Sequence, residues 1–164
     1  MPTNIQNQQV MRAASGFQVA RTSSLVAQSL TSMFTITGGR IIVNALYAKL
    51  TIATDASAAT SIVVGFTATE GAGANIANAI ATATVVGVVR EIGTHWFCTG
   101  TTTAGAAGAL FIGATAATPG PLMTKFILGP GVITYTGSVG VNPGSALWAL
   151  NYVPLDPGVG VVAN

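Results

Sequence analysis

The segment RIIVNALYAKLTIA, residues 40–53, is the longest strand candidate in the chain and indicates a β fold. Its residues alternate in the manner of a strand with one face toward a core and the other toward water or a partner. One parity carries Ile42, Leu46, Ala48, Leu50 and Ile52, and the other carries Tyr47, Lys49 and Thr51. Asn44 interrupts the apolar parity, which predicts a β-bulge or a sheet edge at that position.

Shorter β-prone runs recur between turn signals along the chain. They cover residues 33–37, 61–69, 84–92, 93–99, 109–115, 123–128, 132–139 and 145–153. The turn GPG, residues 129–131, is expected to join two strands that are neighbours in a sheet. In residues 71–83 a short helix competes with a strand, because Ile76 and Ile80 are four positions apart. The regular Gly and Pro breaks predict an all-β single domain, either a β-sandwich or a jelly-roll-like barrel.

Residues 1–32 differ from the rest of the chain because they are polar and rich in Gln, Asn, Ser and Ala. Apolar residues are too sparse there to hold a strand or a helix in place. We therefore expect an extended N-terminal arm, followed by a β domain at residues 33–164. The arm is either a disordered terminus or a segment that becomes ordered only against a neighbouring subunit, with Leu25 and Leu30 as candidate anchors.

The chain carries six Lys or Arg and four Asp or Glu in 164 residues, so 6% of it is charged, against about 25% in an average soluble domain. A soluble monomer needs surface charge to stay dispersed. We therefore expect much of this surface to be covered by copies of the chain and by other proteins. The six cations are scattered, whereas a nucleic-acid surface needs clustered cations to neutralise phosphates, so no nucleic-acid binding is expected.

His95 and Cys98 form the one ionisable cluster worth testing, with Glu91 nearby. Residues three apart on a strand point to opposite faces, so the two side chains would not converge on one metal ion or one substrate. We expect packing roles instead, with Cys98 as a small buried hydrophobe. The Gly-rich segments lack the residues that complete a phosphate-binding loop or a dinucleotide site. We expect no enzymatic activity, no metal and no cofactor.

The remaining carboxylates and the apolar runs add no further site. Asp55 and Asp156 stand in turn-like segments, where Asp usually accepts backbone hydrogen bonds, and Glu70 precedes a Gly-rich loop. Several charge-free runs are long enough to span a bilayer, but each is broken by Gly, Pro, Asn or several Thr. We therefore expect no transmembrane helix and no membrane partner.

Two segments resemble a group of small virion proteins of tailed bacteriophages. LTSMFTITGGRIIVNALYAKLT, residues 30–51, is similar to their opening strands around a Gly-Gly turn. GVITYTGSVGVNPGSALWALNYVPLDPGVGVVAN, residues 131–164, is similar to their C-terminal region. In that region a strand with Trp148 and Tyr152 precedes Pro-Leu-Asp, and the chain ends in a short tail of Gly, Val and Ala.

The resemblance implies a capsid decoration or cement protein that bridges subunits of the major capsid protein and brings no catalytic residues. It also implies a homo-oligomer, a trimer, made in the host cytoplasm and located on the capsid surface of the virion. The segment SALWALNYV, residues 145–153, independently predicts such contacts, because both of its faces are apolar and seek burial. The candidate assembly contacts are Arg12, Arg21, Leu25, Leu30, Tyr47, Trp96, Trp148 and Tyr152.

Two alternatives remain open from the sequence. One is a tail-associated or fibre-associated binding module that contacts carbohydrate or protein on the host surface, with the rings of Tyr47, Trp96 and Tyr135 stacking on sugars. The other is a self-assembling β domain with no partner beyond itself.

Overall fold

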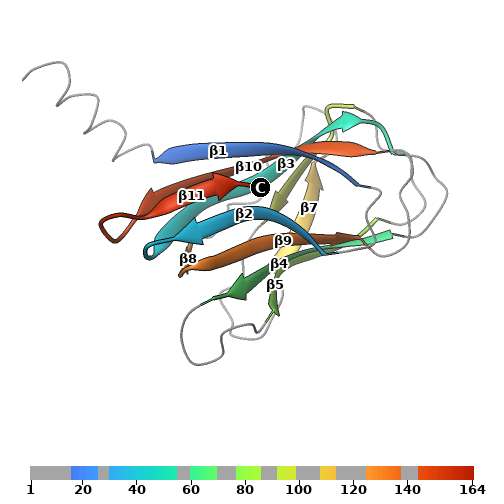
Figure 1. Cartoon of the computed structure of the whole chain (residues 1–164). Coiled ribbons are helices and arrows are strands. Elements are labelled where there is room, and N and C mark those ends of the chain that lie inside the picture. The colour runs from blue at the N-terminus through green and yellow to red at the C-terminus, as the bar shows by residue number, and fades with distance from the viewer. Residues whose placement is uncertain are drawn as a thin grey trace, which may run out of the picture.

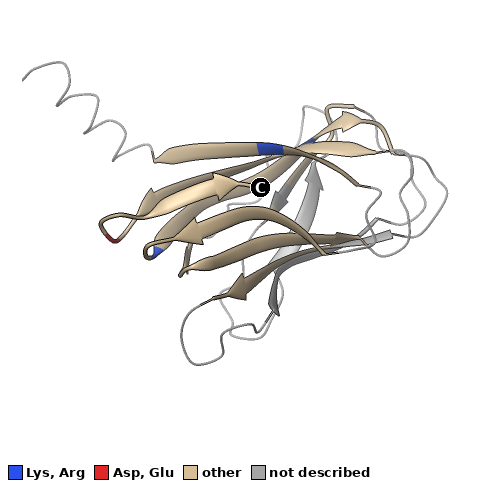
Figure 2. Ribbon diagram, viewed as in Figure 1, with Lys and Arg blue, Asp and Glu red and all other residues tan. Residues whose placement is uncertain are grey.

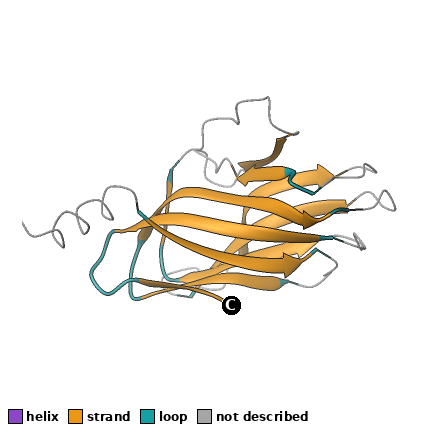
Figure 3. Ribbon diagram, turned by 90° about the horizontal axis from the view of Figure 1, so that it is seen from above, coloured by secondary structure: helices purple, strands orange, loops and turns teal. Residues whose placement is uncertain are grey.

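The structure is a computed structural model that describes residues 16–25, 30–54, 60–69, 77–85, 92–98, 108–113, 125–137 and 144–164. The described residues form strands joined by loops and turns, with no helix (Figure 3). The strands are β1 (Phe17–Ser24), β2 (Thr31–Thr37), β3 (Ile41–Ile52), β4 (Thr60–Ala68), β5 (Ala77–Val85), β6 (His95–Cys98), β7 (Gly108–Gly113), β8 (Phe126–Leu128), β9 (Gly131–Gly137), β10 (Ser145–Pro154) and β11 (Gly160–Ala163). The expected all-β fold is therefore confirmed.

The strands form two sheets packed face to face as a β-sandwich (Figure 1). Sheet A has the order β1-β10-β3, and β6 and β8 pair with the far side of β3 at different points along it. Sheet B has the order β5-β4-β9-β2-β11. The strand β7 pairs antiparallel with β6 and in parallel with β5, so it links the two sheets along one side. On the other side the sandwich is open, and β1 and β11 lie side by side.

A bulge in β3 sets which residues of that strand face the core. Asn151 pairs with Ala45 and Tyr152 pairs with Val43, so Asn44 is the extra residue, and of the two expected alternatives it forms the bulge rather than a sheet edge. A bulge reverses the inward and outward parity of a strand, and here the inward residues switch from odd to even numbers. The buried residues of β3 are Ile41, Val43, Leu46, Ala48 and Leu50. Ile42 points outward because of this bulge, and Ile52 is exposed beyond a second register shift, between its partner Ser145 and Ala146. The expectation that both share the inward face was therefore wrong.

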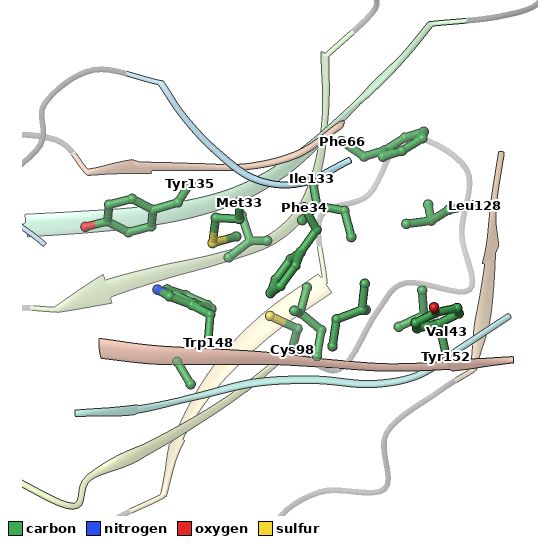
Figure 4. Packing of buried hydrophobic residues seen from close by; sticks show 14 of the residues in the cluster. Met33, Phe34, Val43, Phe66, Cys98, Leu128, Ile133, Tyr135, Trp148 and Tyr152 are labelled. Atoms are coloured by element: carbon green, nitrogen blue, oxygen red, sulfur yellow. The ribbon is translucent and has the colours of Figure 1, made fainter. Parts of the chain in front are cut away.

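The core lies between the sheets and is built around aromatic rings (Figure 4). Trp148 of β10 lies 6.2 Å from Trp96 of β6 and 5.7 Å from Tyr135 of β9, measured between ring centroids. Ala48 pairs with both tryptophans across β3, and its small side chain leaves room for the two rings to approach each other. The three rings therefore connect both sheets.

The first strand corrects the expectation that residues 1–32 hold no strand. Phe17–Ser24 pairs along its whole length with β10, from Phe17 opposite Tyr152 to Ser24 opposite Ser145. Leu25, the next residue, is buried in the core, and its backbone N–H donates to the carbonyl of Gly144 at 2.9 Å. β10 supplies a ready-made edge, so a few inward apolar residues suffice to hold the strand. Residues 1–15 lie outside the described residues.

Three further expectations were wrong in part. Residues 77–85 form a strand, so the competing helix is absent from that part of the segment. The turn GPG does not join neighbours, because β8 pairs with β3 in sheet A while β9 lies between β4 and β2 in sheet B. Of the predicted strand at residues 84–92, Thr84 and Val85 belong to β5 and Ile92 lies in a turn, whereas residues 86–91 lie outside the described residues. β11 was not predicted at all.

Arg21 joins the two sheets at the open side of the sandwich. It lies in β1 opposite Trp148, and its Nη1 donates a hydrogen bond to the backbone carbonyl of Ser32 in β2. β11 ends at Ala163, which pairs with Phe34, so Ser32 lies beyond the end of β11. The guanidinium therefore connects the edge strand of sheet A to sheet B where β11 no longer covers β2.

Candidate assembly surface

His95 and Cys98 do not form a reactive pair. His95 is exposed whereas Cys98 is buried, as expected for residues three apart on a strand. Burial raises the pKa of the Cys98 thiol to about 12, so almost no thiolate is present at neutral pH. The expectation that Cys98 packs as a small hydrophobe is confirmed, and Glu91 lies outside the described residues.

The described part of the chain offers no group of side chains suited to hold a metal ion. No cluster of three or more His, Cys, Asp or Glu occurs among the residues described. Asp156 is held by Arg40, while Asp55 and Glu70 lie outside the described residues. No described helix is long and apolar enough to span a bilayer.

Three of the expected assembly contacts belong to the core. Leu25, Trp96 and Trp148 are each at most 1% exposed, because their side chains fill the space between the two sheets. The chain's own strands cover these side chains, so another protein cannot contact them. Their assignment as assembly contacts was therefore wrong. The sequence identified the faces of β10 correctly, but it could not say which face the chain itself covers.

The remaining candidates have mixed positions. Tyr152 is buried and its ring stacks on Phe17 at 5.7 Å. Leu30 is exposed just before β2. Tyr47 is half-buried on the outer face of sheet A, where its hydroxyl accepts a hydrogen bond from Gln18 Nε2 at 2.8 Å, across β10. Arg21 already serves the chain's own fold, and Arg12 lies outside the described residues.

Two of the three aromatic rings that were expected to stack on sugars are not accessible to a ligand. Trp96 and Tyr135 are buried, and the Tyr135 hydroxyl donates to the carbonyl of Leu25 at 3.2 Å. Burial raises the pKa of that hydroxyl to about 12. Of the three aromatic residues proposed to contact carbohydrate, Tyr47 alone reaches the surface.

An ion pair fastens two turns at one end of the sandwich. Arg40, before β3, and Asp156, after β10, make two parallel side-chain hydrogen bonds of 2.9 Å. The backbone N–H of Arg40 adds a third bond to Asp156 at 2.8 Å. Gly39 precedes this pair with a φ of 151°, and a Cβ added there would lie 2.7 Å from the Cβ of Asp156. Glycine is therefore needed for the two turns to approach so closely.

We expect this ion pair to be sensitive to acid. The side-chain and backbone hydrogen bonds from Arg40 lower the pKa of Asp156 to about 2 from its usual 3.8. The pair therefore stabilises the fold above about pH 4, and its contribution is lost as the pH falls from about 4 to about 2. Asp156→Asn should have a lower Tm than wild type at pH 7, and the difference should shrink toward pH 2.

The measurement is thermal unfolding followed by circular dichroism across this pH range. The effect should be small, because Arg40 and Asp156 are partly exposed to water. Lys49→Gln, which removes an exposed charge outside the pair, is the matched control and should show no acid-dependent difference. Equal Tm values for Asp156→Asn and wild type at pH 7 would contradict the stabilising role.

Sheet B presents a face without charge. None of its strands, β2, β4, β5, β9 or β11, contains Asp, Glu, Lys, Arg or His. Figure 2 shows the described charges on sheet A and on the turns. On the outer face of sheet B, one row of cross-strand neighbours consists of Val162, Thr35, Val132 and Thr67. This face can be covered by another protein without removing a charge from water.

Sheet A presents an aliphatic patch, which we define as Ile42, Ile127, Val153 and Leu155. Val153, Ile42 and Ile127 are direct neighbours across β10, β3 and β8. Leu155 continues the register, since its backbone N–H donates to the carbonyl of Arg40 at 2.9 Å. Ile127 and Leu155 are exposed, and Ile42 and Val153 are half-buried. Sequence reasoning missed this patch because it assigned Ile42 to the core, although the bulge at Asn44 was the signal.

Comparison of the chain with protein-family models, with curated proteins and with solved structures finds no match.

Proposed function

We propose that the chain is a structural virion protein, a capsid decoration or cement protein that binds and stabilises a shell built from the major capsid protein. The observation that carries the proposal is the character of the two outer faces: sheet B bears no charge and sheet A exposes the aliphatic patch. Faces of this kind suit burial against other subunits better than permanent contact with water. The resemblance of residues 30–51 and 131–164 to small tailed-phage virion proteins supplies the setting.

A cement protein acts by adding contact area between subunits rather than by chemistry. Each Å² of apolar surface removed from water contributes roughly 25 cal/mol, and the loss of freedom on association offsets part of that gain. Many copies on a closed shell multiply a modest gain per copy. A rigid β-sandwich suits this task, because few of its described groups need to become ordered on binding.

The experiment compares particles that carry the chain with particles that lack it. Removal of the chain should lower the temperature at which particles release their nucleic acid and should increase their losses at low salt. Particle integrity is measured by the fluorescence of a nucleic-acid dye during heating. Adding back the purified chain should restore the wild-type temperature. Particles without the chain that resist heat and low salt as well as complete particles would contradict the cement function.

The trimer also belongs to this proposal. Native mass spectrometry of the isolated chain tests it directly, since a trimer that forms before docking gives three times the mass of one chain. The alternative of a module that contacts host carbohydrate keeps one of its three rings at the surface, the half-buried Tyr47, and glycan binding by the purified chain would favour it.

A further inference from the structure

We propose that the aliphatic patch on sheet A is the docking surface for the shell subunit, and that the shell subunit meets it with apolar side chains flanked by carboxylates. This inference rests on the proposed function and deepens it, because it identifies the face that docks and the chemistry of the partner. The patch is again Ile42, Ile127, Val153 and Leu155.

The exposed apolar side chains of the sandwich are concentrated on sheet A. Ile127 and Leu147 lie on the outer face of this sheet, and Leu155 directly follows β10. Among β2, β9, β11 and residues 63–68 of β4, Val162 is the single large apolar residue that is exposed. The four residues of the patch are also adjacent across three strands rather than scattered. A contiguous apolar group of this kind marks a contact surface, whereas isolated exposed residues do not.

The charges around the patch indicate what kind of surface covers it. Lys125 is exposed and stands two residues before Ile127, so it has the same outward parity on β8. Arg40 lies beside Leu155, but Asp156 neutralises it. The charge beside the patch that no described carboxylate balances is therefore positive. A partner with Asp or Glu at the edge of an apolar surface would complement it.

The same charges disfavour a second copy of the chain as the partner. Asp156 is the one acidic side chain among the described residues, and it is already paired with Arg40 in its own chain. The described surface of a second copy therefore offers no unpaired acidic side chain to Lys125.

Two nearly equally exposed residues allow a matched test of which face docks. Ile127 on sheet A is 62% exposed and Val162 on sheet B is 60% exposed. The photoreactive residue benzoylphenylalanine replaces Ile127 in one full-length variant and Val162 in another. Each variant is added to particles that lack the chain, irradiated, and analysed by mass spectrometry. We expect position 127 to cross-link to the shell subunit, at a segment that contains Asp or Glu, and position 162 to give no such product.

Substitutions measure the contribution of each part of the surface. Ile127→Asp should reduce the occupancy of particles at a given concentration at least about tenfold, because a charge would be buried in an apolar contact, whereas Val162→Asp should leave it within about twofold. Lys125→Glu should weaken binding about two- to fivefold at low salt and less at high salt. Lys49→Glu, on the same sheet but away from the patch, should bind as wild type. An unchanged Tm shows that each variant is folded.

The outcomes separate this inference from the proposed function. Wild-type occupancy with cross-links from position 162 but not 127 would overturn the docking surface and leave the cement function standing. Cross-links from position 127 to another copy of the chain alone would overturn it in favour of self-association. Failure of the wild-type chain to bind the particles would overturn both proposals.

Discussion

Trp148→Ala should lower the free energy of unfolding by about 3–5 kcal/mol, the usual cost of removing a large aromatic side chain from a core. The ring is fully buried and contacts Trp96 on its own sheet and Tyr135 on the opposite one. Its loss would leave a cavity between the sheets that the neighbouring rings cannot fill. Urea unfolding followed by circular dichroism measures the effect, because one of the two tryptophan fluorophores is removed.

Two controls separate the cavity from other effects. The Trp148 Nε1 is buried and has no hydrogen-bond partner among the described residues. Trp148→Phe removes this unpaired donor together with part of the ring, so its cost should be smaller than that of Trp148→Ala. Leu147→Ala, at the exposed neighbouring position, should change stability by no more than about 0.5 kcal/mol. If Trp148→Ala lowers the free energy of unfolding by less than Leu147→Ala does, the central position of Trp148 in the core is contradicted.

Gly131→Ala should lower the free energy of unfolding by about 1–3 kcal/mol or more, although it adds a single methyl group. A Cβ at Gly131 would lie 2.5 Å from the Phe66 ring and 2.5 Å from the backbone carbonyl oxygen of Thr67. The ring can shift, but the carbonyl belongs to β4, which is paired with β9 at this position. The strand pairing at the start of β9 must therefore loosen to admit a methyl group.

Gly129→Ala is the matched control, two residues away in the same turn. A Cβ at Gly129 meets no atom within 4 Å, and its φ does not require glycine. The same substitution there should be neutral or should stabilise the chain by about 0.4–1 kcal/mol through the unfolded state. Equal effects of the two substitutions in urea unfolding would contradict the close approach of β9 to β4.

The strands with clear alternation could be predicted from the sequence, because period-two patterns follow from backbone geometry alone. β3 and β10 lie within two residues of the predicted ranges, and a single polar residue, Asn44, indicated either a bulge or a sheet edge at the position of the bulge. The outward direction of the Ile42 side chain was not predicted, because it depends on whether Asn44 forms a bulge or marks a sheet edge. Periodicity likewise placed His95 and Cys98 on opposite faces correctly.

Elements that depend on long-range pairing could not be predicted. β1 has the inward residues Phe17 and Val19, but Arg21 follows at the next inward position and breaks the pattern. That cation is tolerated because the strand lies at the open side, where a carbonyl of β2 accepts its hydrogen bond. β11 has four residues and is held by β2, which is far away in the sequence. Neither strand carries enough local signal to be recognised alone.

The assembly surface was harder to predict than the fold. A strand that is apolar on both faces, such as β10, does not reveal which face the chain covers with its own residues. The large rings of Trp96 and Trp148 were taken as contacts, yet their size is the reason that they fill the core. The patch that does reach the surface consists of smaller aliphatic residues brought together from three strands.

The open side of the sandwich bears on how this chain avoids pairing through its edge strands. Edge strands invite pairing with other chains, and many proteins prevent this by placing charges along them. This chain has few charges, and it instead sets its edge strands β1 and β11 beside each other, with Arg21 closing the gap beyond the end of β11. Each strand shields the other from edge-to-edge aggregation. Under the proposed function, contacts with other subunits would therefore involve the side chains of the outer faces rather than exposed backbone.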